Sequence, residues 1–236
     1  MMGPMFGPIR NVVFDLDGTL VETMPSIIRG LKLAVESGLG REVTQAELVA
    51  TFGPPPLGIM RTWFSDEAVA QRAHQVWLDF ERDLDPNEMR AFPGVPEMLE
   101  GLAASGVGLF LFTGRDRNGA LRTLQHNGWL DRYFLADRMR CGDDGFPPKP
   151  APEGLVRLLA DHGIDPASTL MVGDHSMDVK AGRAAGTKTG AALWDLPPGE
   201  KTQRARFREA WSKWDGLPVD VRLIEPTSLL SWLKKP

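Results

Sequence analysis

The 236-residue sequence contains one cysteine, Cys141. A single cysteine cannot form a disulfide within the chain, so nothing in the sequence requires an oxidising compartment. No helix start and no cysteine–histidine pattern that would activate a thiol surrounds it. We therefore predict that Cys141 is a structural or surface thiol.

Long apolar runs and an excess of positive charge are also missing. No stretch approaches the about 20 apolar residues that span a bilayer. The Gly/Pro-rich residues 1–10 lack the apolar centre of a secretory signal. The formal net charge of -4 gives no general electrostatic reason to bind nucleic acid or an anionic membrane. We expect a cytoplasmic protein with no nucleic-acid and no membrane partner, although a local basic pocket for a phosphate group is compatible with this charge.

Short apolar runs predict the strands of a sheet. They cover residues 11–14, 107–112, 169–172, 188–194 and, at an edge, 219–224. Helical patterns lie between them, at 96–105, 118–127, 152–162 and 178–185, and glycine follows them. This alternation predicts an α/β core with a Rossmann-like, doubly wound parallel sheet that helices cover on both faces.

The stretch from Val21 to about residue 90 breaks the alternation, because it holds only helical patterns. Examples are residues 26–37, 45–51 and 67–80, with a rigid Gly-Pro-Pro-Pro turn at 53–56. We predict an inserted all-α domain at 21–92, with a return hinge at 88–94. The core domain then consists of residues 1–20 and 93–236.

Basic and aromatic residues alternate in the segment 200–215. They are Arg204, Arg206, Arg208 and Lys213 with Phe207, Trp211 and Trp214. A basic helix with an aromatic stripe can contact RNA or a membrane. The favoured interpretation is a helix whose aromatic residues face the core and whose charges face water.

Polar motifs follow the predicted strands. They are Asp15 and Asp17 after the first run, Thr113 and Arg115 after the second, Asp174 and Asp178 after the third, and Lys149 in a proline-rich loop. Ligands of open parallel sheets bind beyond the carboxyl ends of the strands. We therefore expect these distant segments to meet at one edge of the sheet.

Four carboxylates at one edge repel one another unless a cation lies among them. Oxygen ligands of this kind suit Mg²⁺. Lys149 adds a positive charge for an anionic substrate and favours an ionised nucleophilic carboxylate. Side chains two residues apart in an extended segment point the same way. Asp15 can therefore attack phosphorus while Asp17 protonates the leaving oxygen, which fits phosphoryl transfer.

The ordered motifs resemble those of the haloacid dehalogenase superfamily. They are Asp15-Leu16-Asp17-Gly18-Thr19-Leu20, Thr113-Gly114, Lys149-Pro150, and Gly173-Asp174 with Asp178. One such motif is weak evidence, but four in the expected order span most of the chain. The helical insert resembles the superfamily's α-helical cap. The whole pattern is most similar to the phosphoglycolate phosphatase-like branch.

The resemblance implies roles for the four acidic residues. Asp15 would be the nucleophile and a Mg²⁺ ligand. Asp17 would be the acid/base and would bind Mg²⁺ through its backbone carbonyl. Asp174 would bind Mg²⁺ directly, and Asp178 would bind it or order its waters.

The resemblance also implies how the phosphoryl group is held. Thr113 and the Gly114 amide would bind it, and Lys149 would neutralise it. Many relatives carry Asn where this chain has Gly114, so only a backbone contact is expected there. Arg115 fits a contact with the substrate and a surface arginine equally. Glu22, where relatives often carry Asp, is expected to be structural.

Other candidates have less support. We expect His175 to be exposed or to pack on the helical insert rather than to bind metal. In the insert, the residues that could face a substrate are Arg29, Lys32, Arg61 and His74. The sequence does not choose among them, and Trp63 and Trp77 are expected in the core of the insert.

These observations predict a Mg²⁺-dependent phosphatase, monomeric or homodimeric, that hydrolyses a small phosphomonoester through an aspartyl-phosphate. Asp17 argues against a dehalogenase, because carbon–halogen displacement has no leaving oxygen to protonate. A nucleotidase or a phosphomutase stays an alternative. A non-catalytic phosphate-binding regulatory protein is a further alternative, although such a protein should have lost one of the motif residues. The partner is a small phosphorylated metabolite: phosphoglycolate, a sugar phosphate, a nucleoside monophosphate or a broad range.

Overall fold

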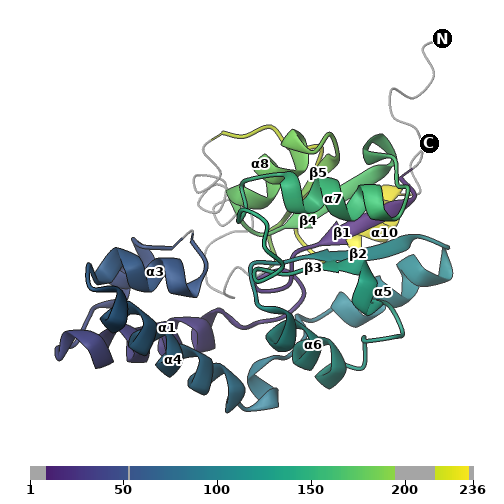
Figure 1. The fold of residues 1–236 in the computed structure, drawn as a ribbon. Coiled ribbons are helices and arrows are strands. Elements are labelled where there is room, and N and C mark those ends of the chain that lie inside the picture. Colours follow the sequence, from purple (N-terminus) through teal and green to yellow (C-terminus); the bar gives the residue numbers. More distant parts are fainter. Residues whose placement is uncertain (1–8, 53, 195–215, 234–236) are drawn as a thin grey trace, which may run out of the picture. The chain divides into compact units, whose positions relative to one another are not determined.

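The computed structural model describes residues 9–52, 54–194 and 216–233 (Figure 1). The chain divides into two compact units. The first joins the segment up to Glu22 to the segment from Ala91 onward. The second is Thr23–Arg90, where the sequence predicts an insert at 21–92. In the part of the chain that is described, no helix has the length and apolar character needed to cross a bilayer.

Within the described residues, the first unit is built on a six-stranded sheet whose neighbouring strands all run parallel (Figure 1). Its order is β3 (Met139–Arg140), β2 (Gly108–Phe112), β1 (Asn11–Phe14), β4 (Thr169–Gly173), β5 (Lys188–Ala192) and β6 (Val221–Leu223). The first strand lies in the middle, and the chain adds strands on both sides of it. This order confirms the predicted doubly wound sheet. The strand predicted at 188–194 ends earlier, at Ala192.

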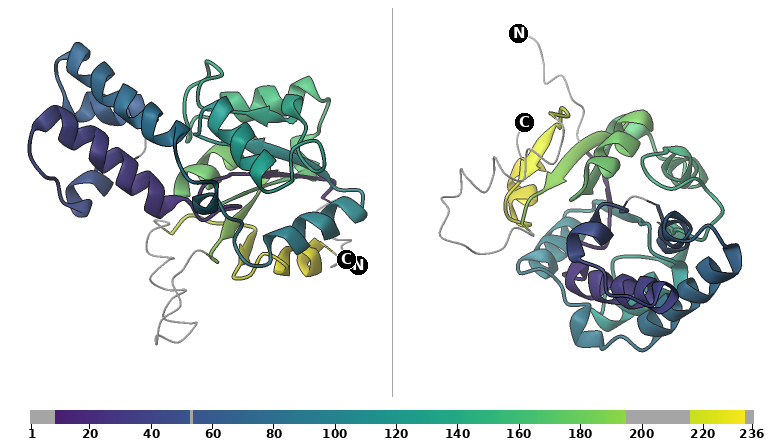
Figure 2. Two further views of the ribbon diagram at one scale, coloured as in Figure 1. Left: turned by 90° about the horizontal axis from the view of Figure 1, so that it is seen from below. Right: turned by 90° about the vertical axis from the view of Figure 1, so that its left-hand side faces the viewer.

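Helices cover both faces of this sheet (Figure 2). They are α5 (Val95–Ala104), α6 (Arg117–His126), α7 (Glu153–Asp161), α8 (Ser176–Ala184) and α10 (Ser228–Leu233). In β1, Val12 and Phe14 belong to the apolar cluster formed with α5, α6 and α10. Val13 belongs to the cluster formed with α7 and α8. Because successive strand residues point to opposite faces, a continuous apolar run is the pattern of a strand buried on both sides.

The second unit is helical. It contains α1 (Met24–Leu39), α2 (Gln45–Val49), α3 (Pro56–Trp63), α4 (Glu67–Arg82) and a short 3-10 turn (Pro86–Glu88). Trp77 is buried in its core and Trp63 is half-buried against it. Gly30 allows α1 to approach α4, because a Cβ atom there would lie 2.3 Å from the Phe80 ring. The side chain of Asp66 caps the start of α4.

Of the described strands and α-helices, β3, α3 and α10 are absent from the sequence prediction. The strand β3 has two residues, too few to form a pattern. The helix α3 begins at Pro56 within a proline run that predicts a turn. Proline is favoured in a first helical turn, because the N–H that it lacks has no partner there. The predicted aromatic-basic helix at 200–215 lies outside the described residues.

The single cysteine lies directly after β3. Cys141 is buried and belongs to the apolar cluster that contains Phe14. Burial raises the pKa of its thiol to about 12. Thiolate is therefore scarce near neutral pH, which favours a structural role for Cys141.

We expect native Cys141 to react much more slowly with Ellman's reagent than the same thiol in guanidinium-unfolded protein, at one mildly alkaline pH. The reason is that the reaction needs both access and thiolate. The chain has one cysteine, so the absorbance at the end point counts this thiol alone. Fast and complete modification of the native protein would contradict its burial.

The centre of the sheet offers a test of the core. Leu111 in β2 is fully buried, and replacing it by Ala should lower the free energy of unfolding by about 2–5 kcal/mol. Leu135 is 38% exposed in the same unit, so Leu135→Ala makes the same chemical change outside the core. Its cost should stay below about 1 kcal/mol. Denaturant unfolding of both variants measures the difference, and equal losses would argue against this core.

Candidate active site

Asp15 lies where β1 meets the carboxyl edge of the sheet. Its N–H donates to the Val172 carbonyl at 2.9 Å, which continues the pairing of β1 with β4. Its side chain is almost fully buried. The loop that follows turns at Gly18, where φ is 78°, a conformation that favours glycine. A Cβ atom at Gly18 would also lie 2.4 Å from Asp174 Oδ2, so glycine permits the close approach of this loop to Asp174.

Three carboxylates gather beside this loop. Asp15, Asp174 and Asp178 each offer an oxygen, and these oxygens lie within 4.8 Å of one another. Asp174 follows β4 and accepts a hydrogen bond from Thr19 Oγ1 at 2.9 Å. Asp178 lies in the first turn of α8 and accepts the His175 N–H at 3.0 Å. Mg²⁺ prefers carboxylate oxygens as ligands, so this group fits that cation by its donor chemistry.

The ammonium group of Lys149 lies between two of these carboxylates. Its Nζ donates to Asp15 Oδ1 and to Asp178 Oδ1, both at 2.6 Å, and to the Phe112 carbonyl at 3.2 Å. Asp15 and Asp178, two of the three clustered carboxylates, thus share this one ammonium group. The negative charge in excess favours the binding of a cation.

Burial and the neighbouring charges both shift the pKa values of Asp15 and Lys149. Burial raises the pKa of Asp15 to about 7; the charge of Asp178 adds to this rise, whereas Lys149 opposes it. Burial alone would lower the pKa of Lys149. The charges of Asp15 and Asp178 outweigh that effect and raise it, so Lys149 stays protonated.

The loop after β2 lies beside the loop that follows β1. Thr113 is buried, and its Oγ1 accepts the Arg115 N–H at 3.1 Å. Gly114 faces open space, because a Cβ atom there would meet no atom within 4 Å. Arg115 is buried, and its guanidinium donates to both carboxylate oxygens of Asp17, from Nε at 3.0 Å and from Nη2 at 2.6 Å.

The structure therefore places the sequence-predicted residues in two sets. Asp15, Lys149, Asp174 and Asp178 form one connected group. The side chains of Asp17 and Arg115 form an ion pair, and Arg115 joins Thr113 through its main chain. Arg115 is thus neither a surface residue nor exposed.

The side chains of the other candidates make contacts of a different kind. His175 is exposed, and its ring accepts the Met177 N–H at 3.2 Å as the cap of α8. Within the helical unit, Arg29 pairs with Glu88, Arg61 with Glu67 and Lys32 with Glu36. His74 is half-buried in α4.

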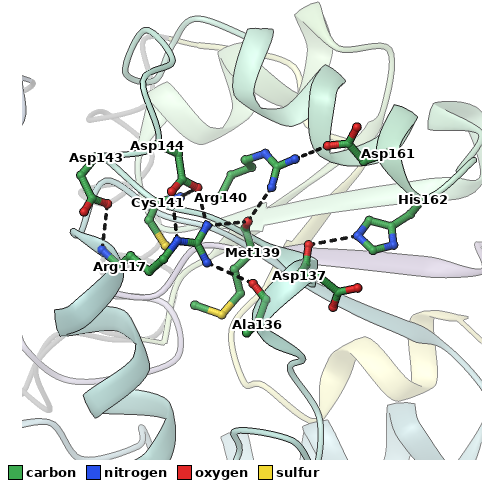
Figure 3. Close-up of polar contacts among 10 residues, drawn as sticks. All are labelled: Arg117, Ala136, Asp137, Met139, Arg140, Cys141, Asp143, Asp144, Asp161 and His162. Atoms are coloured by element: carbon green, nitrogen blue, oxygen red, sulfur yellow. Dashed lines mark hydrogen bonds and ion pairs between the residues drawn. The ribbon is translucent and has the colours of Figure 1, made fainter.

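Sequence reasoning missed the residues that fix the loop after β3. Arg117 begins α6, and its guanidinium donates to Asp144 Oδ1 at 3.0 Å and Oδ2 at 2.6 Å (Figure 3). It also donates to the carbonyl of Ala136 at 3.0 Å. The local sequence carries no signal for this ion pair, since 27 positions separate the partners.

Residues 12–192 match the haloacid dehalogenase-like hydrolase family. Phosphoglycolate phosphatase 1 of Pseudomonas aeruginosa is 32% identical in a match that covers 78% of this chain and 70% of that protein. Pyrophosphatase PpaX of Bacillus cereus is 30% identical over 190 residues, which cover 80% of this chain and 85% of that protein. A solved haloacid dehalogenase-like hydrolase from Streptococcus pneumoniae superposes with a TM-score of 0.72 at 22% identity, over 96% of this chain and 99% of that one.

The family match covers well over half of the chain and includes all of the residues of the candidate site. The structural likeness independently supports the fold. The chain therefore belongs to the haloacid dehalogenase-like hydrolases, and it is an enzyme of the phosphatase type within that family.

Proposed function

We propose that the protein is a Mg²⁺-dependent phosphatase that hydrolyses a small phosphomonoester through a phosphorylated aspartate. One observation carries this proposal. The buried carboxylate of Asp15 lies beside the ammonium group of Lys149 and in one group with Asp174 and Asp178. A nucleophile, a cation for the phosphate and a set of metal ligands are thereby combined at one edge of the sheet.

The acidic group would hold the cation. Asp15, Asp174 and Asp178 supply carboxylate oxygens, and the backbone carbonyl of Asp17 supplies a further ligand, as the family resemblance implies. When bound, Mg²⁺ neutralises charge on the phosphoryl oxygens and on the surrounding carboxylates. Thr113 and the Gly114 amide would hold the phosphoryl group. Arg115 contributes positive charge at the same loop.

The proposed reaction has two steps. In the first, an oxygen of Asp15 forms a bond to phosphorus while the ester P–O bond breaks, and Asp17 gives its proton to the leaving alcohol. In the second, Asp17 takes a proton from water, whose oxygen attacks phosphorus. Phosphate is released and the Asp15 carboxylate is restored. Lys149 opposes the rise in the pKa of Asp15 and so favours its anionic form between turnovers.

The substrate class follows from the residues and from the relatives. Asp17 supports ester hydrolysis, since an alcohol leaves best when protonated. Phosphoglycolate is the first candidate, because one relative is named as phosphoglycolate phosphatase 1. The second relative is named as a pyrophosphatase, which makes pyrophosphate a second candidate. A nucleotidase or phosphomutase activity uses the same carboxylates. We assign the helical unit Thr23–Arg90 the part of a cap that selects the substrate.

Asp15→Asn should lower kcat/KM at least about 1,000-fold, because the amide cannot form the phosphoenzyme. The measurement is phosphate release from phosphoglycolate, pyrophosphate, a sugar phosphate and a nucleoside monophosphate, with Mg²⁺ present. The melting temperature of the variant serves as the folding control. Wild-type turnover by folded Asp15→Asn would refute the proposed nucleophile.

Removal of divalent cations with a chelator should abolish phosphate release, and added Mg²⁺ should restore it. Mg²⁺ should also stabilise the native protein by about 2.7 kcal/mol at a concentration 100 times its Kd, because it binds the folded state. Asp174→Asn should lose most of this stabilisation. Glu100→Gln, which changes an exposed carboxylate on α5, is the matched control and should keep it. Full activity in the chelator would contradict the metal assignment.

A further inference from the structure

We propose that Arg115 is a positioning residue whose guanidinium fixes the orientation of the Asp17 carboxylate for proton transfer. This inference rests on the function proposed above, because it assigns Arg115 a part in the action of Asp17. It replaces both expectations for Arg115 that the sequence leaves open, a substrate contact and a surface arginine.

The geometry of the pair supports orientation rather than simple charge attraction. Nε and Nη2 of Arg115 reach different oxygens of Asp17, at 3.0 and 2.6 Å. Two parallel bonds between a planar guanidinium and a carboxylate define the plane of the carboxylate as well as its distance. Any rotation of the Asp17 carboxylate therefore breaks at least one charge-assisted hydrogen bond.

The surroundings make this pair stiff. The side chain of Arg115 is 3% exposed and that of Asp17 is 17% exposed, so water screens the pair poorly. The remaining exposure belongs mainly to Asp17, the partner that must meet the substrate and water. An arginine that itself bound substrate would instead need its own donors to reach solvent.

Arg115 is in turn fixed from both sides of its backbone. Its N–H donates to Thr113 Oγ1 at 3.1 Å, and its carbonyl accepts the Gly142 N–H at 2.8 Å. Gly142 approaches so closely that a Cβ atom there would lie 2.2 Å from the Gly114 carbonyl oxygen. The loop after β3 thus packs closely against the loop after β2 and supports it.

The ion pair of Arg117 and Asp144 holds the loop after β3 in place. Figure 3 shows the Arg117 guanidinium bound to Asp144 in this loop, to the carbonyl of Ala136 just before β3 and to that of Met139, the first residue of β3. Asp144 also accepts the N–H of Cys141, the residue before Gly142, at 3.0 Å. A continuous set of bonds therefore leads from the start of α6 through Gly142 to Arg115 and Asp17.

A proton donor that is held in place beforehand loses no rotational freedom in the transition state, which is the physical benefit of the pair. Lysine cannot replace arginine here, because its ammonium group makes no planar, two-point contact. The effect should appear in the chemical step and not in substrate affinity. It should be largest when the leaving group needs a proton.

The test compares Arg115→Gln, Arg115→Lys, Asp17→Asn and the double variant Arg115→Gln/Asp17→Asn. Arg132→Gln is the control, since Arg132 forms an exposed pair with Glu100. Single-turnover release of the leaving group is measured with an alkyl phosphate and with p-nitrophenyl phosphate, whose leaving group departs without a proton. Melting temperature and inhibition by orthophosphate report folding and phosphate binding.

Arg115→Gln should slow release from the alkyl phosphate by about 10- to 100-fold, with KM changed less than about 3-fold. Release from p-nitrophenyl phosphate should fall much less, and Arg115→Lys should lie between Gln and wild type. In the Asp17→Asn background, Arg115→Gln should add no further loss, because it acts through Asp17. If the Gln variant does not fold, the Lys variant decides the question by the same comparison.

Two results would overturn the inference. One is a rise in KM with unchanged kcat in both backgrounds, which would make Arg115 a substrate contact. The other is that Arg115→Gln slows the release of both leaving groups equally, or slows neither. If Asp15→Asn and Asp17→Asn both stay active, the proposed mechanism itself fails. If those two lose activity and Arg115→Gln does not, only the role of Arg115 fails.

Discussion

The crowding of three carboxylates, two of which share one buried ammonium group, is the constraint on which the site depends. Burial raises the pKa of Asp15, and the like charge of Asp178 adds to this rise, because charges in a poorly screened environment repel one another strongly. The sheet imposes this arrangement, because Phe14 pairs with Val172 and their strands end side by side. Core packing therefore provides the free energy that holds an otherwise unfavourable group of charges together.

Glycine makes the crowding sterically feasible. A Cβ atom at Gly173 would lie 2.2 Å from Asp178 Cγ, and one at Gly18 would lie 2.4 Å from Asp174 Oδ2. Both glycines lie directly beside a carboxylate of the site rather than at a remote turn. Thr19 then fixes Asp174 through a hydrogen bond, and the indole N–H of Trp194 donates to the Thr19 carbonyl at 2.8 Å. The loop after β1 is therefore shaped by distant parts of the chain.

Much of the fold could be predicted from the sequence, because the buried strands β1, β2 and β4 are apolar runs that end in polar motifs. The order of those motifs also indicated the family. Contacts between distant segments could not be predicted, since nothing local marks them. Arg115 shows this limit, because its partner Asp17 is 98 positions away. The helix α3 was missed for another reason, since proline runs signal turns and helix starts alike.

The site contains two positively charged side chains, those of Lys149 and Arg115. Their different chemistry explains why each pairs with a different aspartate. Lys149 carries a compact charge that can sit between Asp15 and Asp178 and serve both at 2.6 Å. The planar guanidinium of Arg115 donates one hydrogen bond to each oxygen of a single carboxylate, that of Asp17. In the proposed mechanism, the nucleophile Asp15 mainly needs charge balance, whereas the acid/base Asp17 must also face the correct atom. The pairing of lysine with one aspartate and of arginine with the other is therefore what the two proposed roles would require.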